Sequence, residues 1–528
     1  MENNYNNIPV EKFQFATRND LLHDSKFETK PVSYFQGAFK RFSKNKGAVV
    51  GGIVITVLVL FAIFAPFFTP FTPAYYDMSY AYVTPKLPAL DGKNIDFWDG
   101  CRVKSTNNVG YLKDLALAQE TGREVIKNGE YTLTETDEGK TYTYRYDTYY
   151  GVGFGKYKVI SQEEFDDIQR YQNETGRQVL YPVVKVKERP TLEKNKYDAN
   201  IYYKMENPKA SVVRPKLDKD GNIQPNYWKY EVGQESSLIA PYNSLRIEGE
   251  EGVEEKGKNY HYVYGRKVDG GIEIRAEYYE YYTYQHSQVM KDGIEEPSFI
   301  FGTTETGKDI FACLAYGARF SFIFSIVVAA FNFIVGVIWG SISGYYGGKI
   351  DLFMERFAEI LGAVPTIIVI TLLKYHMGSA SQVLVLLIAF FATGWISMAG
   401  RTRMQFYRFK NQEYVLAART LGARDSRIMF KHIFPNGLGT IVTSVALVIP
   451  SMIYTETSFS YLGIINLEAG MITSVGTLIA AGQRSITANA GYVALFPCVF
   501  LVLLMLSFNL FGNGLRDAFN PSLRGTED

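Results

Sequence analysis

Long apolar runs and polar segments follow one another along this chain. The first run, residues 47–68 (GAVVGGIVITVLVLFAIFAPFF), has 22 positions without a charged side chain. At about 1.5 Å of rise per residue, such a helix crosses the hydrocarbon core of a membrane, which is about 30 Å thick. The pattern predicts an all-α membrane body of six transmembrane helices, because five further runs lie at about 320–342, 357–373, 383–399, 438–454 and 492–511.

Basic side chains predict how these helices are oriented. Four of them, Lys40, Arg41, Lys44 and Lys46, crowd just before the first run, and residues 401–436 hold eight Lys or Arg against two acidic residues. The positive-inside rule makes both segments cytoplasmic. Six spans then place both termini in the cytoplasm. A cleaved signal peptide is the alternative for the first run, but that run starts after 46 residues and lacks a small-residue cleavage pattern.

Residues 73–300, between the first two runs, have a different composition. They hold 31 basic and 37 acidic side chains and 28 of the 39 tyrosines, whereas the other 300 residues carry a net charge of +7. Residues 161–176 (SQEEFDDIQRYQNETG) predict a helix with Ser161 and Glu164 as a capping box, and the alternating tyrosines of KTYTYRYD predict a strand. We expect an inserted extracellular α+β domain.

A short sequence echo lies inside this insert. QETGREVI at 119–126 is similar to NETGRQVL at 173–180, and each copy predicts a helix end followed by a strand. The echo indicates either a helix ending used twice or a duplicated α/β unit.

Composition and motifs exclude several function classes. The net charge of +1 over 528 residues argues against a basic nucleic-acid binder, and three cysteines are too few for a disulfide framework. The segment GTTETGKD at 302–309 approaches the phosphate-binding loop pattern, but Asp309 stands where Ser or Thr would hold magnesium, and no buried strand precedes it. No zinc-ligand spacing or catalytic motif stands out. We therefore expect no catalytic residue, no metal and no cofactor in this chain.

The segment 401–436 is the most specific stretch of the chain. Good helix formers precede Gly422, which ends the first short helix, and a second short helix is predicted from Asp425 to Pro435. Small residues beside a cation-rich rim form a flat surface suited to docking, and a solvated basic loop is the alternative interpretation. The candidate docking residues are Glu413, Ala417, Ala418, Gly422 and Pro435.

These residues also carry a family resemblance. LAARTLG followed by KHIFPN resembles the EAA loop of ABC-transporter permeases, and EYVLAARTLGARDSRIMFKHIFPN resembles the C-type subunit of the oligopeptide/dipeptide permease family. FGTTETGKDIFACLAYGARFS, GYYGGKID, RFAEILGAVP, TETSFSYLG and FNLFGNGLRDAFNP follow in family order, and the resemblance covers about 40–72 and 299–521. The chain departs from the family pattern at Leu416, Phe434 and Ser474-Val475-Gly476, and in its outer loop of about 228 residues.

The resemblance implies the type I ABC importer permease fold and a location in the bacterial cytoplasmic membrane. It implies a homologous B-type permease partner, two cytoplasmic ATPases that carry ATP and Mg, and an extracellular substrate-binding lipoprotein. The expected function is oligopeptide import, coupled to the ATPases through the EAA loop. A nickel chelate or glutathione is the alternative cargo, and a membrane-anchored surface-binding protein is the alternative class.

The expected domains and the polar residues within the spans complete this picture. We expect the Arg356 and Glu359 side chains to pair, Asn332 to make a buried hydrogen bond between helices, and Pro365 and Pro450 to kink their helices. Glu456 is a candidate for the pathway, for a peptide amino group or for a subunit contact. The insert either docks the lipoprotein, forms a vestibule over the pore, or is a cap without a ligand. The expected domains are a cytoplasmic segment 1–46, a first helix 47–72, the insert 73–300, a permease core 301–512 with its coupling loop at 401–436, and a cytoplasmic tail 513–528.

Overall fold

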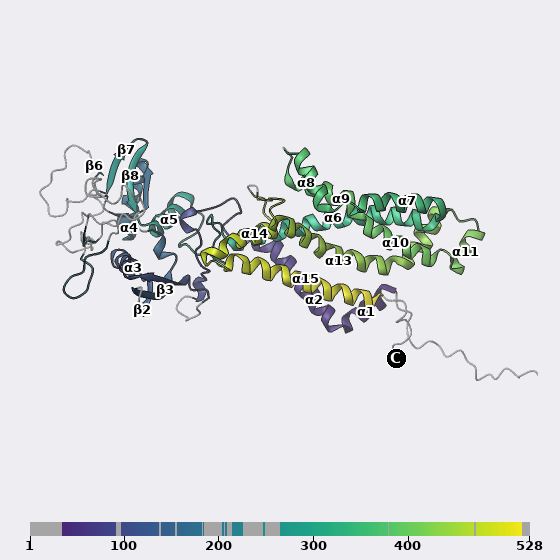
Figure 1. Cartoon of the computed structure of the whole chain (residues 1–528), viewed down its shortest axis with the longest axis horizontal. Coiled ribbons are helices and arrows are strands. Elements are labelled where there is room, and N and C mark those ends of the chain that lie inside the picture. Colours follow the sequence, from purple (N-terminus) through teal and green to yellow (C-terminus); the bar gives the residue numbers. More distant parts are fainter. Residues whose placement is uncertain are drawn as a thin grey trace, which may run out of the picture.

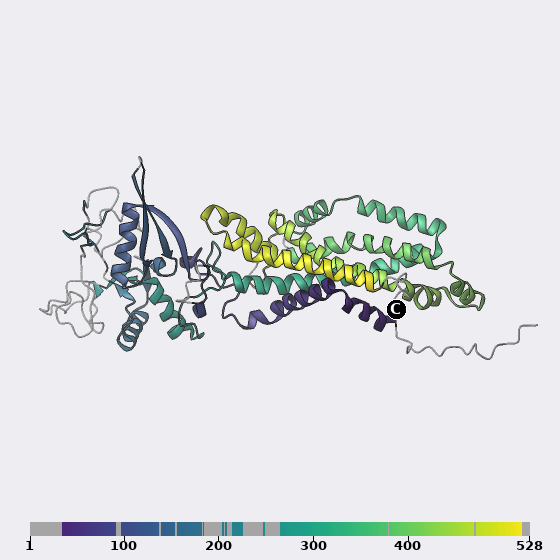
Figure 2. The same ribbon diagram turned by 90° about the horizontal axis from the view of Figure 1, so that it is seen from below.

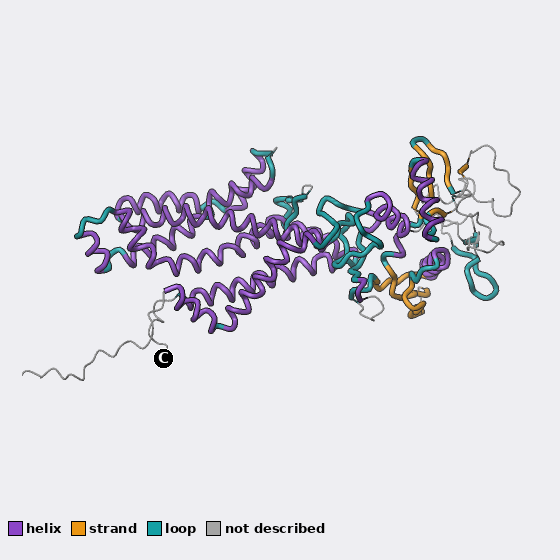
Figure 3. Tube along the Cα trace, turned by 180° about the vertical axis from the view of Figure 1, so that it is seen from behind, coloured by secondary structure: helices purple, strands orange, loops and turns teal. Residues whose placement is uncertain are grey.

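The computed structural model describes residues 34–90, 97–136, 139–153, 156–181, 183, 203–204, 206–207, 214–224, 247–248, 264–378, 380–468 and 471–519. Most of the predicted N-terminal segment, 1–33, and the end of the tail, 520–528, lie outside these residues. The described molecule is elongated, with helices and strands mixed at one end (Figure 1) and a bundle of long helices filling the rest (Figure 3). The mixed end is formed by the insert.

Five helices in the described residues are long and apolar enough to cross a membrane, and one bent pair of helices is a further candidate. The bent pair is α7 (Gly348–Gly362) and α8 (Thr366–His376), whose axes differ by 69°. The six predicted runs therefore correspond to five continuous candidates and one bent pair of helices. The continuous ones are Lys46–Phe67, which contains α2 (Lys46–Phe64), then α6 (Ile310–Tyr346), α9 (Gln382–Thr393) with α10 (Trp395–Phe409), α12 (Asp425–Arg427) with α13 (Phe434–Tyr461), and α15 (Tyr492–Ala518).

The break between α7 and α8 coincides with Pro365, as predicted. Pro365 takes an extended conformation with a ψ of 132°, and its carbonyl accepts a hydrogen bond from the Ile368 amide at 2.9 Å. Proline has no N–H group to continue α7, and its ring disfavours a helical residue before it. Pro450 lies inside α13, and the helix continues past it to Tyr461.

Glycines on one face of α6 allow it to pack closely on α10. Gly336, Gly340 and Gly344 are four residues apart, and a Cβ atom at Gly340 would lie only 2.3 Å from the Ala399 carbonyl oxygen. Small residues at this spacing are common where membrane helices approach each other. Beside this pair, α13 packs on α6, α10 and α15, and α15 packs on α2 (Figure 2).

The start and the end of the described chain lie together. A short helix, α1 (Tyr34–Lys44), precedes α2, and its Arg41 guanidinium donates to the Ala518 carbonyl oxygen at the end of α15 at 2.8 and 3.0 Å. This end of the bundle is the one that lies farther from the insert (Figure 1).

The described part of the insert contains two sheets and three α-helices, and a short π-helix, Gln285–Met290, follows the last of them. The first sheet is antiparallel in the order β1-β3-β2, and the second has the order β4-β8-β7-β6, with β5 also paired to β8. This agrees with the predicted α+β composition. The strands are β1 (Cys101–Asn107), β2 (Ile126–Thr136), β3 (Gly139–Asp147), β4 (Lys156–Ile160), β5 (Leu180–Tyr181), β6 (Ile247–Glu248), β7 (Gly265–Val268) and β8 (Gly271–Ala276), and the helices are α3 (Asn108–Thr121), α4 (Gln162–Thr175) and α5 (Tyr278–Tyr284).

The helix predicted from its capping signals is α4. The Ser161 side chain accepts a hydrogen bond from the Glu164 amide at 3.1 Å, and Gly176 ends the helix in the left-handed conformation. The apolar stripe of the helix faces the core, where Phe165 is 1% exposed. The Glu164 side chain does not close the capping box, because its carboxylate accepts instead from the Tyr281 hydroxyl at 2.8 Å and from a side chain further along the chain.

The echo is a helix ending that is used twice. In both copies a threonine hydroxyl donates to the carbonyl oxygen four residues earlier, from Thr121 at 2.9 Å and from Thr175 at 2.7 Å. A left-handed glycine follows each threonine, with a φ of 69° at Gly122 and 71° at Gly176. The elements around the two copies differ, because α3 packs against the first sheet and α4 against β8 of the second. The structure therefore favours a repeated ending over a duplicated α/β unit.

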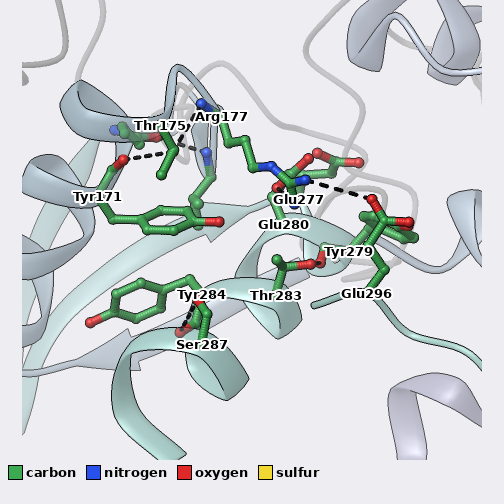
Figure 4. Close-up of polar contacts among 12 residues, drawn as sticks. Tyr171, Thr175, Arg177, Glu277, Tyr279, Glu280, Thr283, Tyr284, Ser287 and Glu296 are labelled. Carbon is green, nitrogen blue, oxygen red and sulfur yellow. Dashed lines mark hydrogen bonds and ion pairs between the residues drawn. The ribbon is translucent and has the colours of Figure 1, made fainter. Parts of the chain in front are cut away.

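The arginine after each glycine pairs with carboxylates in α5 or directly before it. Arg123 donates to Glu277 at 3.0 Å and also pairs with Glu280, while Arg177 lies 3.7 Å from the other oxygen of Glu280. Figure 4 shows Arg177 between Glu280 and Glu296, to which it also pairs at 3.6 Å. The two copies of the echo thus fix α5 from both sheets.

The 302–309 segment joins the insert to the bundle. Gly302 and Gly307 have φ values of 75°, and a Cβ atom at Gly307 would lie 1.7 Å from the Asp77 carbonyl oxygen. The loop pairs with the backbone of residues 77–83 through bonds such as Asp77 N to Gly307 O at 3.3 Å. Asp309 accepts from the Phe311 and Ala312 amides and caps α6. The glycines therefore admit a neighbouring backbone, and the aspartate starts a helix.

Candidate functional site

The predicted docking segment lies at the end of the molecule opposite the insert, where α11 (Glu413–Thr420) projects from the bundle (Figure 1). Val415 is fully buried in a cluster formed with α10 and the helix that follows. The other faces of this short helix are open, since Glu413 and Ala417 are exposed and Ala418 is half-buried. One buried valine therefore anchors a small projecting helix.

Gly422 reverses the chain directly after α11. Its φ is 78°, and the Gly422 amide donates to the Arg419 carbonyl oxygen at 3.0 Å. A Cβ atom at this position would meet no other atom within 4 Å. Glycine is therefore needed for the left-handed backbone and not for space. Leu421 at the tip of the turn is 87% exposed, which leaves a large apolar side chain available for contact.

The second predicted helix does not stop at Pro435, and that prediction is wrong. The helix starts at Asp425, passes through a π-helical segment at Ile428–Ile433 and continues as α13 to Tyr461. Pro435 falls in the first turn of α13, directly after the wider π turn. A proline ring has no N–H group and crowds the preceding turn, and a wider turn at that point relieves both problems. The docking segment is thus continuous with a membrane helix.

Side-chain hydrogen bonds also connect the docking segment to the end of α6. The buried Tyr345 hydroxyl donates to Asp425 Oδ1 at 2.6 Å, and the exposed Tyr346 hydroxyl lies 3.4 Å from Asp425 Oδ2. Arg419 of α11 donates to the Tyr345 hydroxyl at 3.4 Å. We call Tyr345, Arg419 and Asp425 the tether. The tether therefore connects the docking segment to α6, and the continuous backbone connects it to α13.

Comparison with known proteins decides the family. Residues 336–525 match the family described as binding-protein-dependent transport system inner membrane component, and residues 33–87 match the N-terminal TM domain of oligopeptide transport permease C. The oligopeptide transport system permease protein OppC of Bacillus subtilis is 43% identical over 42% of this chain and 72% of its own length. This chain belongs to that permease family. It is a permease subunit of an ABC importer.

Other relatives agree with this assignment. The dipeptide permease protein DppC of Bacillus subtilis is 38% identical over 42% of this chain and 69% of its own, and OppC of Escherichia coli K12 is 36% identical over 43% and 74%. An inward-facing MetNI methionine ABC transporter chain aligns with 39% of this permease and 96% of its own length at 16% identity, with a TM-score of 0.30, too weak a likeness to carry an argument. The two family matches leave residues 88–335 of the permease between them.

A second polar cluster of the permease holds the start of α7 against α10. The Asp351 carboxylate accepts two hydrogen bonds from the Arg403 guanidinium, both at 2.6 Å, and one from the Tyr407 hydroxyl at 2.6 Å. Ser343 at the end of α6 donates to the same carboxylate. This cluster has no local signal in the sequence, because Asp351 and Arg403 are 52 positions apart.

The polar residues predicted within the spans have different surroundings. Arg356 and Glu359 form the expected ion pair at 2.5 Å, with side chains that are 68% and 52% exposed. The hydrogen bond predicted for Asn332 is absent, because neither polar atom of this buried side chain has a partner in the described residues. Asn332 faces Gly394, at which a Cβ atom would lie 2.3 Å from the amide nitrogen, and a glycine offers no side chain to bond.

Glu456 is buried at the contact between α13 and α14 (Val475–Ser485). It is 1% exposed, and one carboxylate oxygen accepts from the Ser460 hydroxyl at 2.9 Å. Gly476 lies directly against it, since a Cβ atom there would be 3.2 Å from that oxygen and 2.7 Å from the Thr457 Cα atom. The glycine of the Ser474-Val475-Gly476 departure thus allows α14 to cover the carboxylate.

Proposed function

We propose that this permease is the C-type half of an ATP-driven importer that moves oligopeptides across the bacterial cytoplasmic membrane. The names of its relatives, OppC and DppC, support a peptide cargo. The proposed partners are a homologous B-type permease, two cytoplasmic ATPases that hold ATP and Mg, and an extracellular substrate-binding lipoprotein. The chain itself is a pore subunit and performs no catalysis.

The tethered docking segment is the observation that carries this proposal. Its small residues and exposed tip fit a groove on a partner, and its tether fixes it to the spans. When ATP brings the two ATPases together, each groove carries its docking helix with it. Because α11 is connected to α6 and α13, that motion becomes a rigid-body swing of the spans between inward-open and outward-open states.

Two substitutions test the docking role. Proline cannot adopt a φ of 78°, so Gly422→Pro removes the chain reversal, and Ala418→Asp puts a charge on the docking surface. We expect both variants to insert normally, to lose co-purification with the ATPases and to lose uptake. Gly400→Ala is the matched control, since its Cβ atom would also meet nothing within 4 Å but its backbone is helical. Normal uptake by Gly422→Pro would refute the assignment.

A different measurement tests the identity of the cargo and the class of protein. We expect peptides to stimulate ATP hydrolysis by the reconstituted complex. Stimulation by a nickel chelate or by glutathione, but not by peptides, would identify that compound as the cargo instead. A membrane-anchored surface-binding protein, the alternative class, would copurify with no ATPase.

We further propose that the insert is extracellular and contacts the binding lipoprotein or forms a vestibule above the pore. Three contacts of the insert junction support this proposal, because they lie at the end of the bundle away from α11. The ring of Phe301 stacks on that of Phe496 of α15, with ring centroids 4.0 Å apart. Two ion pairs lie at the same junction, Lys308 with Glu468 at 2.5 Å and Arg484 with Glu305 at 2.7 Å. The insert is therefore fixed over one end of the bundle, in a position where a docked protein would face the pore.

A deletion designed on this junction tests the proposal. The Lys86 amide donates to the Phe299 carbonyl oxygen at 2.9 Å, so residues 87–297 can be replaced by a short Gly-Ser linker without separating the paired segments. We expect the deletion to keep assembly with the ATPases and to lose uptake and lipoprotein capture. Unchanged uptake and capture would leave the insert as a structural cap.

A further inference from the structure

One face of α13 differs from the outer faces of the other spanning helices. Residues Thr440, Ser451 and Tyr454 are exposed, with the half-buried Thr455 and Ser458 following at helical spacing. Thr56 of α2 and Asn509 and Asn513 of α15 are exposed polar exceptions, but most exposed positions in the apolar stretches of these two helices are aliphatic. The aliphatic ones include Val50, Ile53, Val57 and Leu60 on α2, and Leu495, Val499, Val502, Leu506 and Leu510 on α15.

This hydroxyl stripe indicates which side of the permease faces the transport pathway. Hydrocarbon favours aliphatic side chains, and polar side chains in spans gather where they meet protein or a water-filled cavity. The aliphatic faces of α2 and α15 therefore suit lipid. The hydroxyl positions of α13, which lie on both sides of Leu447 between Thr440 and Ser458, suit the aqueous route between the two permease halves.

A pocket of about 490 Å³ opens at the Thr440 end of the stripe, between α10, α13 and α15. Its floor includes Thr440, Thr443 and Ser444 of α13, and two glycines leave it open. Three arginines from two other helices surround it. We call it the arginine pocket, and its charged lining consists of Arg401, Arg408 and Arg516.

The three arginines have no carboxylate partner among the residues that the structure describes. No carboxylate in the described part of the chain lies within 4 Å of the guanidinium groups of Arg401, Arg408 or Arg516, although Arg403 on the same helix α10 is paired with Asp351. Guanidinium groups bind carboxylates through paired N–H donors, and hydroxyls at the floor add further donors. The pocket is therefore suited to an anionic group.

We propose that the arginine pocket receives the terminal carboxylate of the transported peptide at the cytoplasmic end of the pathway. This inference rests on the proposed peptide import. The pocket continues the hydroxyl stripe, which favours a transported molecule over a lipid headgroup. All three arginines are solvent-exposed, so their hold on a carboxylate is weak enough to permit release.

Uptake of two peptides that differ only in the terminal charge tests the proposal. The complete transporter is reconstituted in proteoliposomes, and initial uptake rates of tetra-alanine and of its C-terminal amide are compared. For Arg401→Gln and Arg516→Gln, we expect the acid-to-amide ratio to fall about twofold to fivefold, the range of an exposed ion pair. The triple variant, in which Arg408→Gln is added to these two substitutions, should lower the acid-to-amide ratio further. Each variant's acid-to-amide ratio is compared with that of the unaltered transporter. Any preference of the binding lipoprotein for one of the two peptides cancels in this comparison.

Arg356→Gln is the matched control, because it removes an exposed arginine of α7 that lies outside the pocket and is already paired with Glu359. Its acid-to-amide ratio should equal that of the unaltered transporter. An equal loss of both peptides in the pocket variants would overturn the proposal. If that equal loss also depends on anionic lipid in the vesicles, the pocket holds a lipid headgroup instead. A transporter that moves neither peptide before substitution refutes the peptide-import function itself.

Discussion

Removing one hydroxyl group from the tether should uncouple ATP hydrolysis from transport. Tyr345→Phe deletes the donor that reaches Asp425 Oδ1 at 2.6 Å and keeps the ring that packs beside Val415. The neighbouring Tyr346 reaches the same carboxylate at 3.4 Å from an exposed position. Tyr346→Phe is therefore an internal control of identical chemistry.

The expected free-energy cost of each substitution follows from the geometry of the hydrogen bond that it removes. A hydrogen bond to a charged group contributes about 1.5–3 kcal/mol, and the exposure of Asp425 favours the lower end, which is about tenfold in an equilibrium constant. The hydrogen bond of Tyr346 is long and solvated, so its loss should cost only a few tenths of a kcal/mol. This corresponds to a change of about twofold or less in the equilibrium constant. Asp425→Asn keeps an acceptor oxygen without the charge and should fall between the two.

Peptides transported per ATP hydrolysed is the quantity to measure, in proteoliposomes that contain the complete transporter. Tyr345→Phe should lower this ratio several-fold while the ATPases still copurify, because the docking face of α11 is intact. Tyr346→Phe should stay within twofold of the unaltered transporter. A normal ratio for Tyr345→Phe, or equal losses in both variants, would show that the tether does not transmit the motion.

Three further substitutions address the junction, the insert and the buried carboxylate. Gly307→Ala puts a Cβ atom 1.7 Å from the Asp77 carbonyl oxygen and should speed hydrogen exchange across 77–83; unchanged exchange would contradict the packing. Glu120→Gln breaks a buried ion pair with Arg275, in which both side chains are 2% exposed, and should cost about 3–5 kcal/mol by chemical denaturation of the insert, whereas an apolar pair at both positions should restore stability. Glu456→Gln keeps an acceptor for Ser460 and should retain uptake, so a large loss would assign the charge a role in transport.

The parts of this fold that the sequence predicts are those with a local signal. The apolar runs locate the spans, and Ser161 and Gly176 mark the two ends of α4, because capping depends on residues a few positions apart. The runs underestimate helix length, since α6 begins at Ile310 and α15 ends at Ala518, beyond the apolar stretches. Helices continue into polar surroundings wherever their backbone bonds remain satisfied.

The residues that the sequence analysis missed or misjudged depend on distant partners. Asp351 acquires its role only when α10 brings Arg403 beside it. Pro435 is a stop signal in isolation, but the preceding π turn admits it to a continuous helix. Asn332 was expected to bond between helices, and it meets a glycine instead. In each case the deciding neighbour is set by packing rather than by spacing along the chain.

One helix connects the two ends of the molecule that the proposed function requires to communicate. α6 has 37 residues, which corresponds to about 55 Å at 1.5 Å per residue. It begins at Ile310, directly after Asp309 in the loop that binds the insert, and ends at Tyr345 and Tyr346, which bind the docking segment. Under the proposed function, a tilt of α6 imposed at the tether should therefore also displace the insert junction.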